Sequence, residues 1–473
     1  MLSVTLFALA INGITSVLPS DVLATLFVDD LSLSFSASRM AVAERKIQLC
    51  INQISKWADM RGFRFSTSKT VVMHFCHIKG IHPDPDLYLY GNRISCVEEA
   101  RFLGLIFDRK LTWGPHIKNL KARCLKSLDI LKALSHTSWG ADRKHMLLLY
   151  KALVFSKLSY GCEVYSSATE GRLKTLDSIH NAGIRIASGA FKSSPISSML
   201  VDSGELPLDL CRKSILIKYF FRVQRLSDSL TCQEIFNKSY FSYYNEHKKC
   251  PKPFRYRIHK VLEELDVPKN TIQPCKISSV PPWNLPEVEY CNCLGNSKSN
   301  FNEEEMRSVF LEHLNEHAGS DFIFTDGSKS SAGVGFGVIF PNFNSSGSLP
   351  PISSIFTAEL YGILVALKQI LILDEKNFVI FSDSRSVLDI LKSFNPVHPL
   401  VLEVLHWLIL IRRRGKSVEF CWVPAHVGIG GNECADKLAR EAPFSKRPIK
   451  CALPYGDLIP AVNSTMKNVW QFY

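Results

Sequence analysis

The hydrophobic and polar positions in the first part of the chain predict a helix, a hairpin and then mixed elements. Residues 1 to 19 are mostly apolar with scattered polar interruptions and no basic residue, which favours a buried helix over a signal peptide or membrane span. Residues 23 to 35 read as a β-hairpin: an apolar strand, a tight turn at Asp29 and Asp30, and a strand in which Leu or Phe alternates with Ser. We then expect a helix over 40–61 and strands over 70–75 and 102–107.

A basic helical segment is predicted next. From Ile117 to Leu134, apolar residues recur every three or four positions, and lysines occupy other positions. Similar periodicity returns over 145–160 and 173–186. Residues 101 to 200 contain sixteen Lys and Arg against six Asp and Glu, which accounts for most of the net charge of +12. This excess favours a nucleic-acid backbone as partner, the alternative being a solvated helix face.

The last third of the chain has the pattern of an α/β domain. Prolines crowd between about 240 and 300, which forbids long helices and predicts a linker. Beyond it, short apolar runs predict strands over 322–325, 334–340, 378–381 and 418–422, and a longer run predicts a helix over 358–371. This order is typical of a sheet covered by helices.

Composition limits the class of protein. The 473 residues are 46% hydrophobic and 21% charged, which excludes a disordered or fibrous chain and suits two or three globular domains. The 14 cysteines lack zinc-finger spacing, since the one close pair, Cys291-Asn292-Cys293, has no second pair, so we expect free thiols in an intracellular protein, with nucleus or cytoplasm left open. Because Met1 falls inside a predicted core element, we expect the chain to be cut from something longer.

Four acidic residues fall near the predicted C-terminal elements: Asp326, Glu359, Asp383 and Asp436. Phosphodiester hydrolysis can use two Mg²⁺ ions, which supply a hydroxide and balance charge on the leaving oxygen, and such ions are held by carboxylates. Without metal, converging acids repel one another, which a purely structural site would avoid. Taken singly, each acid could be an ordinary helix cap or solvated turn residue.

The motifs around these acids occur in a characteristic order. They are Phe-Thr-Asp-Gly-Ser at 324–328, Thr-Ala-Glu-Leu at 357–360, Phe-Ser-Asp-Ser at 381–384, and Trp-Val-Pro-Ala-His at 422–426 followed by Gly-Asn-Glu at 431–433. Together with Asp436 they resemble type 1 ribonuclease H over residues 317 to 445. The resemblance implies a mixed sheet with flanking helices and hydrolysis of the RNA strand of RNA/DNA hybrids.

The resemblance also implies roles for individual residues. Two Mg²⁺ or Mn²⁺ ions would be held by the four acids, Asp326, Glu359, Asp383 and Asp436. His426 would assist proton transfer and product release. Ser328, Ser384 and Asn432 correspond to positions near the hybrid.

The N-terminal half resembles another family. Phe-Val-Asp-Asp at 27–30 resembles the catalytic turn of reverse transcriptases, and later blocks resemble the palm and thumb of jockey-type non-LTR retrotransposon polymerases. The implied organisation is a partial α+β palm over 1–110, a helical thumb-like region over 111–208, a connection over 209–316, the ribonuclease H domain over 317–445 and a tail over 446–473.

The palm lacks one chemical requirement. Two-metal nucleotidyl transfer needs a further carboxylate from an earlier strand, and the only acid before Asp29 is Asp21, a poor substitute in a turn segment. We expect the fingers to precede Met1 and Asp29 and Asp30 to be vestigial. The leading hypothesis is a metal-dependent hybrid endonuclease without membrane association. The alternatives are an RNA-directed DNA polymerase, if the chain is a fragment, and a non-catalytic nucleic-acid-binding remnant.

Overall fold

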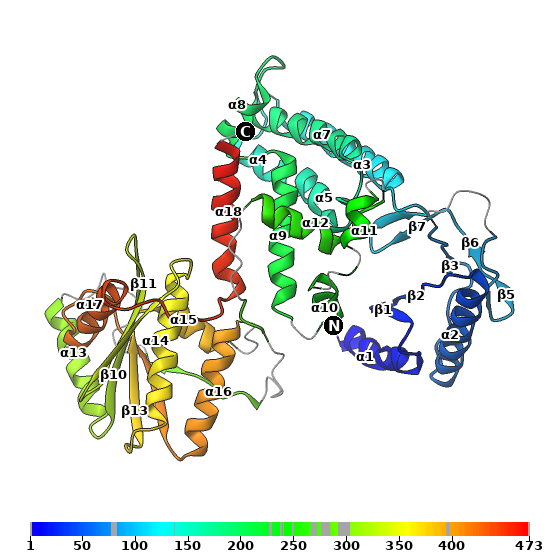
Figure 1. The fold of residues 1–473 in the computed structure, drawn as a ribbon. Coiled ribbons are helices and arrows are strands. Elements are labelled where there is room, and N and C mark those ends of the chain that lie inside the picture. The colour runs from blue at the N-terminus through cyan, green and yellow to red at the C-terminus, as the bar shows by residue number, and fades with distance from the viewer. Residues whose placement is uncertain are drawn as a thin grey trace. The chain divides into compact units, whose positions relative to one another are not determined.

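The computed structural model describes residues 2–76, 83–136, 138–226, 229–236, 239, 241–247, 250–265, 272–275, 284–291, 303–393 and 398–471. These form two compact units, Met1–Leu208 with Lys248–Pro253, and Asp209–His247 with Phe254–Tyr473 (Figure 1). Within the described ranges, every helix is too short or too polar to cross a membrane.

The first unit begins with the predicted helix, but this helix is not buried. Helix α1 (Leu2–Ile11) continues into a 3₁₀ helix, Asn12–Val17. Leu9 is 70% exposed, and burial begins only at Ile11. The expectation of a buried helix was wrong because the small cluster around Trp57 of α2 (Met40–Met60) covers only the end of this apolar segment.

The predicted hairpin is confirmed, with its turn one residue earlier. Strands β1 (Leu23–Phe27) and β2 (Asp30–Ser34) are antiparallel, and Phe27 pairs with Asp30, so Val28 and Asp29 form the turn. Val28 has a φ of 56°, which a two-residue hairpin turn requires. Asp29 and Asp30 are both exposed.

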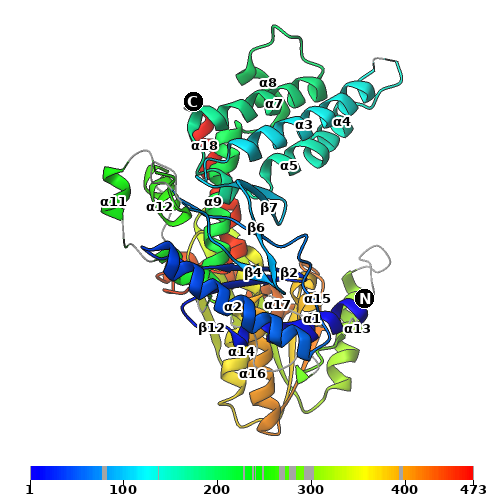
Figure 2. The same cartoon turned by 90° about the vertical axis from the view of Figure 1, so that its right-hand side faces the viewer.

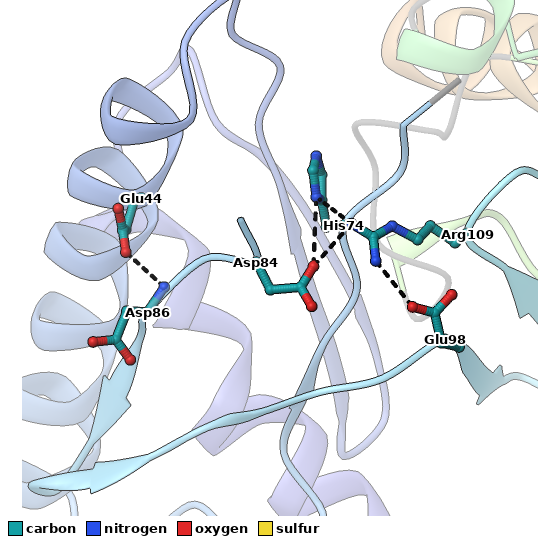
Figure 3. A network of polar contacts seen from close by, with 6 residues as sticks. All are labelled: Glu44, His74, Asp84, Asp86, Glu98 and Arg109. Atoms are coloured by element: carbon teal, nitrogen blue, oxygen red, sulfur yellow. Dashed lines mark hydrogen bonds and ion pairs between the residues drawn. The ribbon is translucent and has the colours of Figure 1, made fainter. Parts of the chain in front are cut away.

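The rest of this α+β part consists of short strands. The strand expected over 70–75 is reduced to β3 (Val71–Val72), which pairs with β6 (Ser95–Cys96). Two antiparallel hairpins follow the same region: β4 (Tyr88–Leu89) with β5 (Asn92–Arg93), and β7 (Glu99–Phe102) with β8 (Leu105–Asp108). Figure 3 shows that Arg109, directly after β8, forms ion pairs with two acids that precede the hairpins. Its Nη2 lies 2.9 Å from Asp84 Oδ1 and its Nη1 2.9 Å from Glu98 Oε1.

The predicted basic helices are present. They are α3 (Gly114–Leu134), α4 (Arg143–Tyr150), a π-helical turn (Lys151–Phe155), α5 (Ser156–Ser159), α6 (Cys162–Tyr165), α7 (Glu170–Ser188) and α8 (Ile196–Ser203). Figures 1 and 2 show α3 and α7 side by side. On α3, Leu120 and Leu128 are buried while Lys118 and Lys126 are exposed, as the periodicity predicts.

Helices also occur where the prolines predict a linker. Helices α9 (Leu208–Gln224) and α10 (Leu230–Phe236) precede the proline-rich stretch, and two short helices, α11 (Phe241–Glu246) and α12 (Phe254–Glu264), lie within it. Helix α12 begins directly after Pro253, where a proline costs no intrahelical hydrogen bond. Part of the proline-rich stretch, including Pro268, Pro281 and Pro282, lies outside the described residues, as do Asn292 and Cys293.

A six-stranded mixed sheet forms the centre of the second unit. Its spatial order is β12 (Asn344–Leu349), β11 (Gly333–Ile339), β10 (Asp321–Ser330), β13 (Asn377–Ser382), β14 (Ser417–Trp422) and β9 (Tyr290–Cys291). The pairs among β12, β11 and β10 are antiparallel, and those from β10 to β9 are parallel. The four predicted strands and the mixed α/β class are thus confirmed.

Helices cover both faces of this sheet. One face packs against α14 (Ile355–Ile370), α15 (Arg385–Leu391) and α16 (Pro399–Arg413), as Figure 1 shows for α14 and α16. The other face packs against α13 (Glu303–Glu316) and α17 (Gly430–Ser445). Phe310 of α13 belongs to the same buried cluster as Phe381 of β13. A final helix, α18 (Tyr455–Gln471), follows.

Candidate active site

Two of the predicted acids stand where a parallel strand pair ends. Strands β10 and β13 pair from Asp321 with Phe378 to Thr325 with Ser382. The next residues along these strands are Asp326 and Asp383. The register of the sheet therefore brings the two carboxylates together.

Helix α14 brings the third acid. Its N-cap residue Ser354 accepts a hydrogen bond at 3.1 Å from the backbone N–H of Thr357, which fixes the start of the helix. Helix α14 lies so close to β10 that only a glycine fits at position 327. As a result, carboxylate oxygens of Asp326, Glu359 and Asp383 all lie within 4.8 Å of one another.

This crowding is electrostatically costly. Asp326 and Glu359 are 5% and 6% exposed. Burial, followed by the neighbouring carboxylates, raises the pKa of Asp326 to about 8. The same causes raise the pKa of Glu359 well above its usual value, and burial raises that of Asp383. Among the described residues, Glu359 Oε2 is buried without a hydrogen-bond partner.

The fourth acid, Asp436 on α17, adjoins this group. Its carboxyl is near enough to Asp326 to raise the pKa of that residue. Arg440, one turn later on α17, forms an ion pair with it, with Nη2 2.7 Å from Oδ2. His426 Nδ1 lies 4.0 Å from the same oxygen. The imidazole is 67% exposed and sits on a residue with a φ of 57°, so it reaches from solvent toward Asp436.

Asn432 lies closer to the acids than its predicted role near the hybrid implies. Its Nδ2 donates to Asp383 Oδ2 at 3.4 Å, a contact that lowers the pKa of Asp383 against the effect of burial. Its Oδ1 is buried and has no hydrogen-bond partner among the residues that the structure describes. Ser384 follows Asp383 at the start of α15, and Ser328 lies two residues beyond Asp326 on β10; both are half-buried.

Three neighbours of the site were not singled out from the sequence as functional. Gly327 permits the close approach of α14, Arg440 pairs with Asp436, and Trp422 Nε1 donates to the backbone oxygen of Asp383 at 3.1 Å. The pairing of Asp436 with Arg440 could have been predicted from the sequence, because residues four apart lie next to each other on a helix. The Trp422 contact depends on the pairing of β13 with β14, which residue spacing does not disclose.

The donor set suits a hard divalent cation. Mg²⁺ and Mn²⁺ prefer carboxylate oxygens, and the three clustered acids offer such oxygens within 4.8 Å of one another. The unsatisfied Glu359 Oε2 is a further oxygen for such an ion. The residues present therefore fit the metal that the sequence resemblance implies.

Comparison with known proteins identifies this part of the chain. The model of the RNase H family matches residues 318–443, which include all the acids described above. Residues 318–443 form an RNase H domain. This domain supports hydrolysis of RNA/DNA hybrids as its general activity and implies nucleic-acid binding.

The chain is also similar to retrotransposon proteins. It is 26% identical over 204 residues to a Retrovirus-related Pol polyprotein from type-1 retrotransposable element R1 of Bradysia coprophila, covering 41% of this chain and 20% of that protein. It is 25% identical over 183 residues to the RNA-directed DNA polymerase from mobile element jockey of Drosophila melanogaster, covering 37% and 19%. The chain thus spans about a fifth of the length of these relatives. The predicted relationship to non-LTR retrotransposons is confirmed.

Proposed function

We propose that this protein is a type 1 RNase H that cleaves the RNA strand of RNA/DNA hybrids with two Mg²⁺ or Mn²⁺ ions. The observation that carries the proposal is the cluster of Asp326, Glu359 and Asp383, three acids from three separate elements with oxygens within 4.8 Å. Burial and mutual repulsion raise the pKa values of these carboxyl groups, so the ionised cluster destabilises the metal-free fold. A bound cation would offset this cost.

The four acids have different proposed roles, which follow from their positions. Asp326, Glu359 and Asp383 would hold the cations, and Asp436 would complete the site from α17. The bound cations would supply a water of lowered pKa and neutralise charge on the leaving oxygen. Asn432 donates to the carboxylate of Asp383 and Trp422 donates to its backbone oxygen, so both act as positioning residues.

His426 is placed to move a proton. Its exposed imidazole lies beside Asp436 rather than inside the carboxylate cluster, so it can exchange protons with solvent and with a leaving group at the edge of the site. Gly428 N donates to Glu433 Oε1 at 3.0 Å, which fixes the loop that follows His426.

For the N-terminal half we propose nucleic-acid binding without polymerisation. Asp29 and Asp30 are exposed, and among the described residues no third acid joins them in a group that could hold a metal. Asp21, the acid that precedes Asp29 in the given sequence, is paired with Lys46, with Nζ 2.8 Å from Oδ1. The exposed lysines of α3 are proposed to contact the phosphate backbone of the hybrid.

The test uses the full chain and a hybrid labelled on its RNA strand. Cleavage should require added Mg²⁺ or Mn²⁺ and should disappear in Asp326→Asn and Asp383→Asn. Asp374→Asn changes an exposed acid of the same domain and is the matched control, expected to retain full activity. Full activity of purified Asp326→Asn would contradict the metal assignment.

A further inference from the structure

A second group of possible metal ligands lies away from the four acids, where β9 joins the sheet. Strand β9 pairs in parallel with β14, and Cys291 stands directly opposite Cys421. Opposed residues on neighbouring parallel strands point to the same face, with strands about 4.8 Å apart. The sheet thus places two thiols next to each other, although 130 residues separate them in the sequence.

Helix α13 covers the same face. Cys421 is fully buried in the cluster that contains Phe310 of α13. His313 is three residues after Phe310, so it lies one turn along the same side of the helix. Its ring is 6.3 Å from the ring of Phe381, which is the strand neighbour of Cys421 on β13.

The donor atoms converge. One ligand atom each from Cys291, His313 and Cys421 lie within 4.8 Å of one another. His313 is 7% exposed, and within the described part of the chain its Nε2 is buried without a hydrogen-bond partner. Its other ring nitrogen, Nδ1, lies 3.6 Å from Glu316 Oε2. A buried imidazole with one nitrogen facing a carboxylate and the other unsatisfied is the arrangement found at metal-bound histidines.

We propose that Cys291, Cys421 and His313 bind a zinc ion. Two thiolates and an imidazole are soft to borderline donors, which select Zn²⁺ over the hard Mg²⁺ of the carboxylate site. Tetrahedral zinc holds sulfurs about 3.8 Å apart and sulfur and nitrogen about 3.6 Å apart, so a small contraction of the present group suffices, and a water would be the fourth ligand. The exposed Cys291 leaves a path for the ion to enter.

The zinc ion would have a structural role. Strand β9 and helix α13 both precede residue 318, where the RNase H match begins. A zinc ion would link both of them to β14, a central element of the domain. This role goes beyond the hydrolytic site, and its readouts do not depend on cleavage.

The first experiment measures metal binding by the purified full chain. The protein is reduced, loaded with Zn²⁺ in the presence of excess Mg²⁺, and freed of unbound metal by gel filtration. We expect one zinc per chain by elemental analysis. Replacement of Zn²⁺ by Co²⁺ should give a thiolate-to-cobalt charge-transfer band, which carboxylates do not produce.

Variants then assign the ligands. Cys291→Ser changes an exposed position and should fold, yet it should reduce retained zinc at least tenfold and weaken the cobalt band. Cys434→Ser removes another exposed cysteine of the same domain and should change neither. Cys421→Ser and His313→Gln should match Cys291→Ser, with circular dichroism used to confirm folding.

Three outcomes would overturn the proposal. They are retention of no zinc by the reduced wild-type chain, equal zinc content in Cys291→Ser and Cys434→Ser, and cobalt binding without the thiolate band. A Cys291–Cys421 disulfide found by peptide mapping of the reduced, zinc-loaded protein would likewise exclude the site.

Discussion

A Cβ atom at Gly327 would lie 2.5 Å from the backbone nitrogen of Glu359. Such an atom would push α14 away from β10 and move the Glu359 carboxylate out of the cluster. We therefore expect Gly327→Ala to lower hybrid cleavage at least tenfold and to cost about 1–3 kcal/mol in free energy of unfolding. Thermal unfolding and cleavage assays of the full chain measure both effects.

Gly456→Ala is the matched control for this substitution. No neighbouring atom of the described residues lies within 4 Å of a Cβ at that position, and the residue belongs to α18. We expect it to be neutral or slightly stabilising. If Gly327→Ala behaved like Gly456→Ala, the close approach would have no bearing on the site.

Stability in EDTA should fall as pH rises. Burial and neighbouring acids raise the pKa of Asp326 from 3.8 to about 8, so between these values the folded state binds a proton more tightly than the unfolded state. The resulting stability is present below about pH 4 and is lost as pH rises through about 8. Denaturant titrations of the metal-free chain across this range measure the trend.

Asp326→Asn tests the cause of this trend. Without the titrating carboxyl, the slope should flatten and the metal-free protein at pH 8 should gain about 1–3 kcal/mol, although cleavage is lost. Asp374→Asn should keep the wild-type slope, since that acid is exposed. Added Mg²⁺ should stabilise the wild type at pH 8 more than Asp326→Asn. Identical pH profiles for the two variants would show that the carboxylate cluster is not strained.

His426→Ala should slow cleavage without removing its metal dependence. The imidazole lies beside Asp436 but outside the carboxylate cluster, and water can partly replace it as a proton carrier. We expect kcat to fall by up to about 100-fold, with the half-saturating Mg²⁺ concentration nearly unchanged. His406→Ala, an exposed histidine of α16, is the control. Loss of metal binding in His426→Ala would instead make this residue a ligand.

The lysines of α3 should set the salt dependence of hybrid binding. Each phosphate neutralised by a lysine releases counterions, so replacing Lys118, Lys121 and Lys126 with Gln should reduce the salt slope by up to about 3 units. Binding is measured in EDTA, which prevents cleavage. Three exposed lysines of the other unit, Lys376, Lys450 and Lys467, give a charge-matched control. Equal slopes for the two triple variants would mean that α3 only presents a solvated face.

The C-terminal sheet was predictable from sequence because its strands are buried, apolar and bounded by motifs. The strand β12, Asn-Ser-Ser-Gly-Ser-Leu, was not, since it has little strand propensity. It forms because it pairs along β11, where Gly347 lies so close under Phe336 that a Cβ would be 2.6 Å from that ring. Its presence depends on tertiary packing, which local pattern does not report.

The acids were predictable by order and motif, but the surroundings of the site were not. The hydrogen bond from Trp422 to Asp383 and the contact of Gly327 with α14 arise from strand register and helix docking. The grouping of Cys291, His313 and Cys421 has the same origin. The two cysteines are 130 positions apart, so their spacing does not reveal that they are neighbours in the sheet. Sequence likewise could not show that much of α1 is left exposed by the described residues.

The position of α13 has a practical consequence for anyone expressing the nuclease alone. Phe310 covers Phe381, with ring centroids 5.3 Å apart, and Phe310 lies eight residues before the family match begins. A fragment cut at the boundary of that match would expose apolar side chains of β13 and β14 and leave an open strand edge, a known route to aggregation. A soluble recombinant nuclease should therefore start upstream of Leu285, which packs against the same domain.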